Sequence, residues 1–535
     1  MLQLEDLAAW LVCTSCVLTL IPVMRRPPPR PRGWLLVLSS LLFLSVLHIV
    51  ADQPFLARSA FALWSLLVIV PSLATTRLRY ALLRRDLVRA QRWAYLLALT
   101  HPADGMLAQA QFVRFLLAME RSDPQSAEEQ LQRLARSPAW HRRAMLQWLR
   151  ETTGWERVMS AFSDGTYCAD EPLLSTMYVQ ALGETGQLNA MWEAFGRLAP
   201  EVRARADVRM MVVGLGGSFG LMQRLLKLPT AVASDVCRFW HASAMQTCGL
   251  SSEAELPLQK LAAAGGAPAR WAQARLRKPL PDQRAYEFTQ QARSRIDALR
   301  RQVDEEQALS IPRERRGMAW GTISLGAVLL GVFASSVPGG SSNILNLIEL
   351  GALVLPPTLV DGHLGYRIVA AGLLHFGGTH LFVNLLGLWV LGHQVERLWN
   401  STTLWLFFFA SSIGAMAIAV VTMAATPTEP KIIVGASAGV MGLVGALFTF
   451  AAVGYFVAGN TLLRRSLTRI VAIVGLQTLF DWMTPAVSSQ LHLTGLLLGA
   501  LVALPFAHHR FRKQARIAER VSSKTEEPHL PLDEA

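Results

Sequence analysis

The chain begins with three long apolar stretches that are separated by short polar segments. These stretches, residues 7–24, 34–51 and 60–74, are nearly uncharged and have about the length that a helix needs to cross a bilayer. Arg58 lies at the edge of the third stretch and would have to extend its guanidinium group to the lipid headgroups. The pattern therefore predicts a three-span membrane region over residues 1–76.

Over residues 77–300 the pattern changes to amphipathic helices with polar faces and short Gly or Pro breaks. Within residues 173–200, aromatic and small residues have spacings that resemble those of a tetratricopeptide helical hairpin. Prolines that we expect to end helices recur at irregular steps along this segment: Pro138, Pro200, Pro229 and Pro268. The segment is predicted to be a helical-repeat domain, with an irregular helical bundle as the alternative. Either one would present a binding surface to a protein partner.

A charged juxtamembrane linker, residues 301–317, precedes a second apolar region over residues 318–508. Between its first two spans, residues 338–378 form a long connection. The apolar residues 350–359 within it are too few to cross a bilayer and are expected to lie in its interface. A basic and then acidic tail follows at residues 509–535. Six apolar stretches predict six further transmembrane helices: residues 318–337, 381–399, 404–425, 438–458, 468–483 and 491–507.

Composition supports an all-α polytopic membrane protein that carries a water-exposed domain. The chain is 52% hydrophobic and 17% charged. The charged fraction is about 6% over residues 317–508 and about 25% over residues 77–316, and only the second value is ordinary for a soluble domain. A purely cytosolic enzyme, a disordered chain and a disulfide-stapled secreted module are excluded. The five cysteines are too scattered for a zinc module, and no pattern indicates a metal or a cofactor.

Basic clusters beside the apolar stretches predict the orientation in the membrane. They supply much of the net charge of +13, which favours contact with anionic lipid over contact with nucleic acid. Positive flanks mark the cytoplasmic side. We therefore expect the N-terminus outside a bacterial inner (plasma) membrane, and the helical domain and the C-terminus in the cytoplasm. The clusters are Arg25, Arg26, Arg30 and Arg32; Arg77, Arg79, Arg84, Arg85, Arg89 and Arg92; Arg313, Arg315 and Arg316; Arg464, Arg465 and Arg469; and Arg510, Arg512, Lys513 and Arg516.

Four polar residues occur in the second apolar region where hydrocarbon penalises them, and such residues are functional candidates. His380 and Asn384 are four residues apart and share one face of a helix. Ser437 and His492 lie at the starts of the fourth and sixth predicted spans. In the predicted topology all four residues lie near the outer ends of their helices, so they are expected at a similar depth.

The pairing of a serine with a histidine indicates nucleophilic catalysis. A serine hydroxyl is a poor nucleophile until a neighbouring base, most often an imidazole, accepts its proton. Gly435 beside Ser437, and Gly495 and Gly499 after His492, would let two helices approach closely enough for these side chains to meet. Attack on a carbonyl creates an oxyanion that needs hydrogen-bond donors. The backbone N–H groups at the start of the Ser437 helix would supply them, assisted by the helix dipole.

Over residues 312–510 the chain resembles the rhomboid family of intramembrane serine proteases. The resemblance implies that Ser437 is the catalytic serine and His492 the catalytic histidine. It also implies that His380 and Asn384 stabilise the oxyanion. The matching segments are GYRIVAAGLLHFGGTHLFVNLLGLWVLGHQVER from residue 365, GASAGVMGL from residue 435 and HLTGLLLG from residue 492.

Some residues near these motifs depart from the family pattern, and others are expected to lie outside the catalytic pair. Tyr366 stands where the family commonly has tryptophan, and Met441 stands where an aromatic ring often packs against the catalytic histidine. His375 is expected either to form a structural hydrogen bond or to assist catalysis. Asp481 is expected at the outer interface, so that no aspartate completes a triad. Glu396 is expected at the cytoplasmic end of its helix in a structural role.

The resemblance implies a serine endopeptidase with a Ser-His dyad. Its substrates would be single-pass transmembrane proteins, which it would cut near the outer face of the membrane without a cofactor. The alternative is a non-proteolytic rhomboid-like scaffold that binds transmembrane clients in the bundle and soluble partners through the helical domain.

Overall fold

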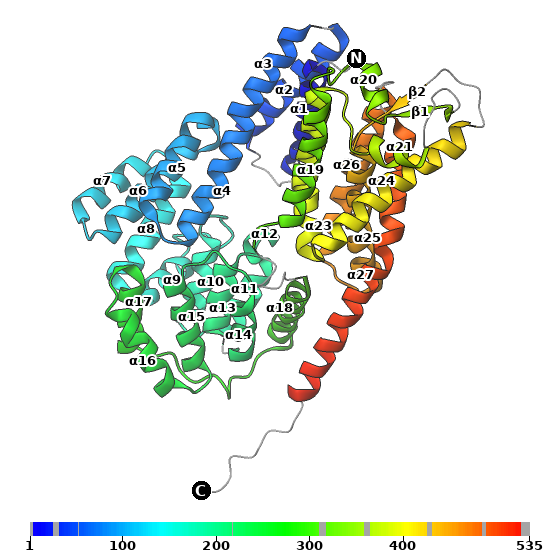
Figure 1. Ribbon diagram of the computed structural model, residues 1–535. Helices are drawn as coiled ribbons and strands as arrows, with labels where there is room; N and C mark the ends of the chain where they lie inside the picture. The colour runs from blue at the N-terminus through cyan, green and yellow to red at the C-terminus, as the bar shows by residue number, and fades with distance from the viewer. Residues whose placement is uncertain are drawn as a thin grey trace. The chain divides into compact units, whose positions relative to one another are not determined.

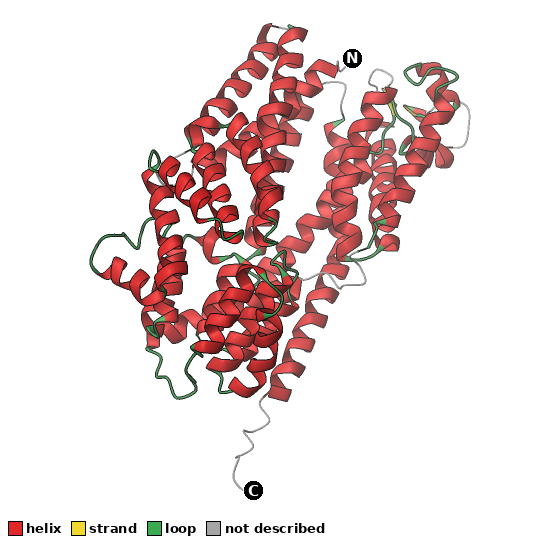
Figure 2. Ribbon diagram, turned by 90° about the vertical axis from the view of Figure 1, so that its left-hand side faces the viewer, coloured by secondary structure: helices red, strands yellow, loops and turns green. Residues whose placement is uncertain are grey.

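The structure is a computed structural model that contains two compact units, one of residues 5–307 and one of residues 308–535 together with the first four residues. Nearly all of the described chain is helical (Figure 1, Figure 2). The prediction of an all-α polytopic membrane protein is therefore confirmed. The structure describes residues 4–24, 31–51, 53–216, 218–309, 317–357, 364–424, 431–483 and 488–525.

Among these described residues, five helices are long and apolar enough to cross a membrane: Arg32–Ala51, Pro54–Leu83, Ser401–Thr422, Ser437–Val457 and Ser489–Lys513. Two shorter apolar helices are Ala8–Ile21 and Trp320–Ser336. The chain is thus an integral membrane protein. Several of the basic clusters that predict its orientation, including Arg25, Arg26 and Arg30 and the group Arg313, Arg315 and Arg316, lie outside the described residues.

The first unit begins with the helices α1 (Leu4–Met24) and α2 (Arg32–Ala51). A third, continuous helical run consists of α3 (Pro54–Trp64), the π-helical turn η1 (Ser65–Ile69) and α4 (Val70–Leu83). Arg58, which is predicted to extend to the lipid headgroups, forms an ion pair through its Nη2 with Glu5 of α1 at 2.7 Å. Pro71, the second residue of α4, lacks the N–H of an ordinary helical residue and lies two residues after the π-helical turn, where a helix can accommodate that loss.

The rest of this unit is a series of short helices around several apolar clusters, and the largest of these is formed mainly by helices after residue 175. Trp192 is fully buried at its centre, and Gly186 turns the chain between α10 and α11 with φ +79°. The helices are α5 (Leu87–Thr100), α6 (Met106–Glu120), α7 (Pro124–Leu134), α8 (Pro138–Thr153), α9 (Trp155–Ser163), α10 (Ser175–Glu184), α11 (Leu188–Arg197), α12 (Pro200–Arg203), α13 (Ala206–Leu215), α14 (Phe219–Lys227), α15 (Ser234–Thr247), α16 (Ser251–Ala262), α17 (Gly266–Arg277) and α18 (Gln290–Leu309). The tetratricopeptide-like order of these helices stays a prediction.

The expectation that prolines end the helices of this unit is wrong for most of them. Pro138 and Pro200 are the first residues of α8 and α12, and Pro268 lies in the first turn of α17. Only Pro229 follows the end of a helix, α14. The N–H groups of a first turn have no partner within the helix, so proline loses no hydrogen bond there and its fixed φ suits the helix.

In the second unit, each of the six predicted spans falls on one helix or one continuous helical run. α25 is the central one, since 67% of its membrane-length window is buried against at most 44% for the other candidate spans. The elements are α19 (Trp320–Ser336), α20 (Ile344–Glu349), β1 (Leu353–Leu355), α21 (Leu364–Ala371), α22 (Gly377–Gly387) continued by η5 (Leu388–Gly392) and α23 (His393–Leu398), α24 (Ser401–Ala424), β2 (Lys431–Ile433), α25 (Ser437–Ala452) continued by η6 (Val453–Val457), α26 (Leu463–Met483) and α27 (Ser489–Thr525).

The apolar part of the long connection is buried in this unit. Leu353, Val354 and Leu355 form β1, which pairs with β2 in antiparallel register, and all three are buried. Protein contacts thus account for the apolar character of these residues, and their position in the membrane interface stays a prediction. Residues 358–359 of the same segment, residues 310–316 of the predicted linker and the end of the acidic tail lie outside the described residues.

Candidate active site

Ser437 is the first residue of α25, directly after the turn that follows β2. Gly435 in this turn has φ +131°, a conformation that favours glycine. A side chain at this position would also come within 2.7 Å of Cε1 of the His380 ring. The Gly435 N–H donates to the carbonyl oxygen of Ala371 at 2.8 Å. The turn thus holds Ser437 at the start of a helix, where backbone N–H groups lack partners within the helix.

Two histidines lie against this turn. The imidazole rings of His375 and His380 are 5.1 Å apart between centroids. His375 is fully buried, its Nδ1 lies 3.0 Å from the carbonyl oxygen of Leu373, and its Nε2 accepts a hydrogen bond from the Ala436 N–H at 3.5 Å. Because backbone groups occupy both of its nitrogens, the geometry favours the structural alternative for His375, in which it supports the turn before Ser437.

A row of glycines brings α25 and α27 into backbone contact. A Cβ atom at Gly495 would overlap the carbonyl oxygen of Ala438, and one at Gly499 would overlap the carbonyl oxygen of Gly442. The contacting positions rise together along the two helices, so α25 and α27 run parallel and begin at the same end. Small residues are what permit such an approach between membrane helices.

This register puts Ser437 and His492 at the same end of one helix pair, because each lies in the first turn of its helix. His492 is buried, with 8% of its surface exposed, and Ser437 is partly exposed. Both residues belong to the described part of the chain, and no hydrogen bond joins their side chains there. Catalytic hydrogen bonds are often long in a site without substrate and shorten when substrate binds.

Asp481 belongs to this site, so the expectation that it lies apart at the interface is wrong. Its Oδ2 is 2.8 Å from Nδ1 of His492, and its Oδ1 accepts a hydrogen bond from the Gln477 side-chain amide at 2.8 Å. Only 6% of Asp481 is exposed, and a buried carboxylate needs such partners. Its occurrence near the end of an apolar helix, at the predicted depth of His492, was the signal in the sequence that could have identified it.

Asn384 and Met441 lie one helical turn from residues already described. Asn384 is buried, and its Nδ2 donates to the carbonyl oxygen of His380 in the same helix at 3.1 Å. Met441 is partly buried on α25, four residues after Ser437. The structure therefore brings His380 to the Ser437 turn, while the side chain of Asn384 bonds within its own helix.

Glu396 joins three elements away from this site. Its carboxylate accepts hydrogen bonds from the N–H groups of Gly321 and Thr322 at 2.7 and 2.8 Å, and from the hydroxyl of Ser401 at 2.6 Å. It caps the start of α19 and ties it to α23 and α24. These contacts agree with a structural role.

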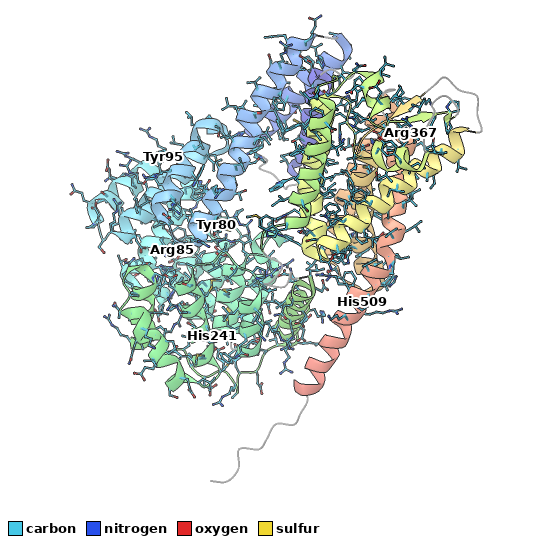
Figure 3. The ribbon with its side chains drawn as sticks, viewed as in Figure 1. Tyr80, Arg85, Tyr95, His241, Arg367 and His509 are labelled. Atoms are coloured by element: carbon cyan, nitrogen blue, oxygen red, sulfur yellow. The ribbon has the colours of Figure 1, made fainter. Side chains whose placement is uncertain are left out.

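Tyr366 and Arg367, of which Arg367 is labelled in Figure 3, fix the long connection against α21. Arg367 Nη1 donates to the carbonyl oxygens of Ile348 and Ala352 at 2.8 and 2.9 Å. The Tyr366 hydroxyl donates to the carbonyl oxygen of Leu350 at 2.5 Å. Tryptophan, which the family commonly has at this position, would offer an indole N–H. The Tyr366 hydroxyl supplies a donor to the backbone carbonyl instead. Among the residues that the structure describes, no group of three or more His, Cys, Asp or Glu side chains could hold a metal ion.

Comparison with known proteins finds its family match in the part of the chain that contains this candidate site. Residues 363–509 match the family model of the Rhomboid domain. The chain is 26% identical over 221 residues to rhomboid protease GluP of Bacillus subtilis, a match that covers 41% of each chain. It is 28% identical over 160 residues to RHOMBOID-like protein 4 of Arabidopsis thaliana, covering 30% of this chain and 38% of the relative.

A third relative, rhomboid protease AarA of Providencia stuartii, is 28% identical over 191 residues, which cover 33% of this chain and 66% of the relative. The chain therefore spans well under half of the first two relatives. No solved structure matches it significantly. The match to the domain model includes the serine turn, both flanking histidines and the Asp481–His492 pair. Residues 363–509 are thus similar to the Rhomboid domain.

Proposed function

We propose that this protein is an intramembrane serine endopeptidase. The observation that carries the proposal is the junction of α25, α26 and α27. There, a serine at a helix N-terminus lies at the same end as a histidine whose Nδ1 is bonded to a buried carboxylate. This arrangement differs from the expected Ser-His dyad, because Asp481 bonds to His492 and would be the third residue of a Ser-His-Asp triad.

In the proposed reaction, the Ser437 hydroxyl attacks a peptide carbonyl while Nε2 of His492 accepts its proton. The hydrogen bond from Nδ1 to Asp481 selects the tautomer whose Nε2 is unprotonated and stabilises the imidazolium that forms. The oxyanion is stabilised by the N–H groups of the first turn of α25 and by His380, with Asn384 as a further candidate. The imidazolium then protonates the leaving amine, and water hydrolyses the acyl-enzyme with His492 again acting as the base.

The substrates that suit this site are single-pass transmembrane proteins. A peptide bond in a helix is shielded, and its carbonyl is already hydrogen-bonded, so cleavage requires a segment that unwinds near the end of its span. We place the site toward the outer face of a bacterial inner membrane. The N-terminus would then lie on that same outer side, and the helical domain would lie in the cytoplasm, where it can bind a protein partner.

The proposal is tested with a serine-directed phosphonate probe on the purified full-length protein. The wild-type chain is expected to be labelled covalently, and Ser437→Ala and His492→Ala are expected to abolish labelling. Ser335→Ala, a change of an exposed serine at the end of α19, serves as the control and should label normally. Undiminished labelling of Ser437→Ala would remove the proposal. A non-proteolytic scaffold would instead bind transmembrane clients equally well with both substitutions and release no fragments.

A further inference from the structure

A cavity of about 200 Å³ lies in the first unit, where the turn after α4 meets α8, α10, α13, α15 and α17. Its lining includes apolar side chains, among them Leu82, Val208 and Met211. The lining also includes four arginines, Arg85, Arg143, Arg150 and Arg205. Such a concentration of positive charge in a partly buried space is costly unless each cation has a partner.

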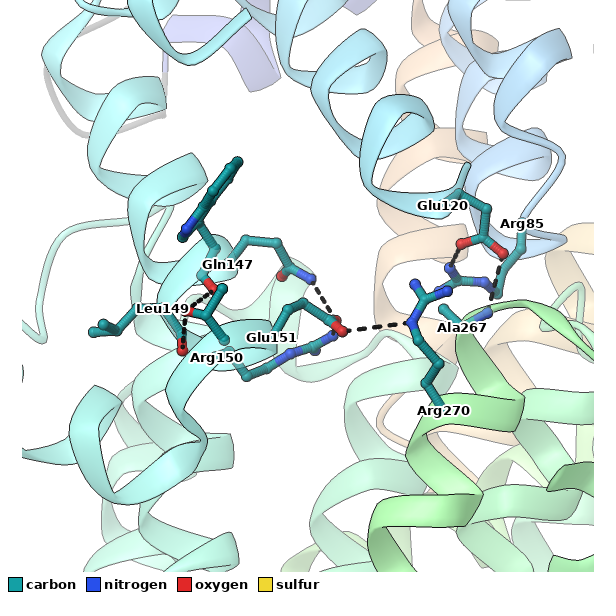
Figure 4. A network of polar contacts seen from close by, with 10 residues as sticks. Arg85, Glu120, Gln147, Leu149, Arg150, Glu151, Ala267 and Arg270 are labelled. Atoms are coloured by element: carbon teal, nitrogen blue, oxygen red, sulfur yellow. Dashed lines mark hydrogen bonds and ion pairs between the residues drawn. The ribbon is translucent and has the colours of Figure 1, made fainter. Parts of the chain in front are cut away.

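Three of the four arginines have carboxylate partners. Arg85 pairs with Glu120 at 2.8 Å, Arg150 with Glu151, and Arg205 with Asp207 at 2.6 Å. Figure 4 shows the first two of these pairs, with Arg270 approaching Glu151 from α17. These arginines are thus neutralised within the protein.

Arg143 has no such partner. Among the described residues no carboxylate lies within ion-pair distance of it, and its Nη1 is buried without a hydrogen bond. Burial, together with the like charges of Arg150 and Arg205, lowers the pKa of Arg143 to about 10. The guanidinium therefore remains charged at neutral pH while lacking a counterion.

Trp271 provides a second unused donor in the same cavity. Its indole Nε1 is buried without a hydrogen-bond partner. Its ring lies against two of the arginines, with Cζ of Arg85 at 5.0 Å and Cζ of Arg150 at 5.4 Å from the ring centroid. Both residues whose donors lack a partner line the cavity.

The backbone at Arg85 adds an independent observation. Arg85 has φ +57° at the end of α4, a position and conformation where glycine is usually favoured. The chain has an arginine there, although the left-handed conformation is unfavourable for residues with a Cβ atom. The side chain reaches Glu120 and the cavity, so the strained position contributes to the cavity lining.

We propose that this cavity binds the phosphate group of a small organic phosphate or of a lipid headgroup, with Arg143 as the residue that receives the anion. The cationic side chains come from α8 and from the turns after α4 and before α13. A phosphate group offers three acceptor oxygens to such guanidinium groups, one more than a carboxylate. A volume equal to roughly seven waters holds a phosphate and a few carbon atoms, which would contact the apolar side chains of the lining.

The cavity also adjoins a membrane-length helix of the same unit. Leu82 and Leu83, which end the helix Pro54–Leu83, form part of its lining. A soluble metabolite could reach the cavity from the water phase, and a lipid headgroup could reach it along the helix, so the experiment separates these sources.

The test measures equilibrium binding of radiolabelled inorganic phosphate and of glycerol 3-phosphate to the purified full-length protein. The wild-type chain is expected to bind saturably. Arg143→Gln should weaken binding about 10- to 100-fold, the effect of losing charge-assisted hydrogen bonds. Arg157→Gln, at an exposed arginine of α9, is the matched control and should bind within about twofold of wild type.

Thermal unfolding gives a second readout that does not depend on the radiolabel. Without phosphate, Arg143→Gln should unfold at the same temperature as the wild type or at a higher one, because the variant lacks a cation whose buried Nη1 has no hydrogen-bond partner. Phosphate should raise the unfolding temperature of the wild type and not that of the variant. If Arg143→Gln fails to fold, the saturable binding of the wild type still decides the question.

Competition identifies the source of the phosphate. Displacement of labelled phosphate by nanodiscs containing phosphatidic acid, and not by nanodiscs of phosphatidylcholine alone, would assign the site to a headgroup. Displacement by glycerol 3-phosphate alone would assign it to a soluble phosphate, and both outcomes support the proposal. It is overturned if the wild type shows no saturable binding, if folded Arg143→Gln binds like wild type, or if succinate displaces phosphate equally well.

Discussion

At the residue scale, the contact between His492 and Asp481 has the largest chemical consequence. The imidazole can act as a base through Nε2 only if the other nitrogen carries the proton, and the carboxylate 2.8 Å away holds that proton on Nδ1. Gln477 bonds the second carboxylate oxygen and so restrains the orientation of Asp481. In the proposed function, Asp481 is therefore a positioning residue that acts through His492.

We expect Asp481→Asn to lower kcat about 100- to 1000-fold with KM within about threefold, because an amide can donate to Nδ1 and stabilise the wrong tautomer. Steady-state cleavage of a fluorogenic transmembrane substrate measures both constants. Gln477→Ala, which leaves the carboxylate in place, is the control and should lose less than about tenfold. An unchanged kcat in Asp481→Asn would show that this hydrogen bond is only structural.

The sequence predicts Ser437, His492, His380 and Asn384 because polar groups are costly in an apolar span and these lie in recognisable motifs. It does not predict the role of Asp481. The contact joins the end of one helix to the start of the next, and its geometry depends on how these two ends pack. Hydropathy gives the depth of a residue but not the direction of its side chain.

At the element scale, the contact between α25 and α27 determines whether the site forms. The carbonyl of Gly442 occupies the space in which a side chain at Gly499 would lie. The small residues of both helices predict their close approach. The parallel register, which places the two N-termini together, requires the tertiary structure, because α26 must first return across the unit.

Gly499→Ala is expected to lower stability by about 1 to 3 kcal/mol through overpacking, and to reduce activity by separating Ser437 from His492. Gly475→Ala on α26 is the matched control, since a Cβ atom at Gly475 meets no atom within 4 Å. It should change stability by less than about 0.5 kcal/mol. Thermal unfolding and cleavage are measured on the same samples. Equal effects of the two substitutions would contradict the packing account.

In the first unit, the sequence predicts the helices themselves better than it predicts where each of them begins and ends. Proline indicates that a helix boundary is near, but it fits both the first turn of a helix and the segment that follows one. Pro138 begins α8, whereas Pro229 follows α14. The apolar pattern locates the helices of this unit, and only the backbone shows on which side of each proline they lie.

At the scale of the whole molecule, all the residues of the candidate active site belong to one compact unit, and the arginine-lined cavity belongs to the other. The proposed chemistry and the proposed phosphate binding therefore depend on separate sets of contacts. Effects of distant substitutions in separate units are expected to be additive.

Deleting residues 95–295 should leave cleavage of a generic transmembrane substrate within about threefold of the full-length rate, because no residue of the candidate active site is removed. The range of clients cleaved in cells should change if the helical domain recruits substrate or restrains activity. Quantitative mass spectrometry of released fragments compares the two chains. An identical client range would identify the domain as a spacer.

The central claim is tested most directly by cleavage of a single-pass membrane substrate in vesicles that contain the purified protein. The wild-type chain and Ser335→Ala should release a fragment cut near the end of the substrate span, whereas Ser437→Ala and His492→Ala should release none. Equal cleavage by wild type and Ser437→Ala would contradict the claim that this hydroxyl is the nucleophile.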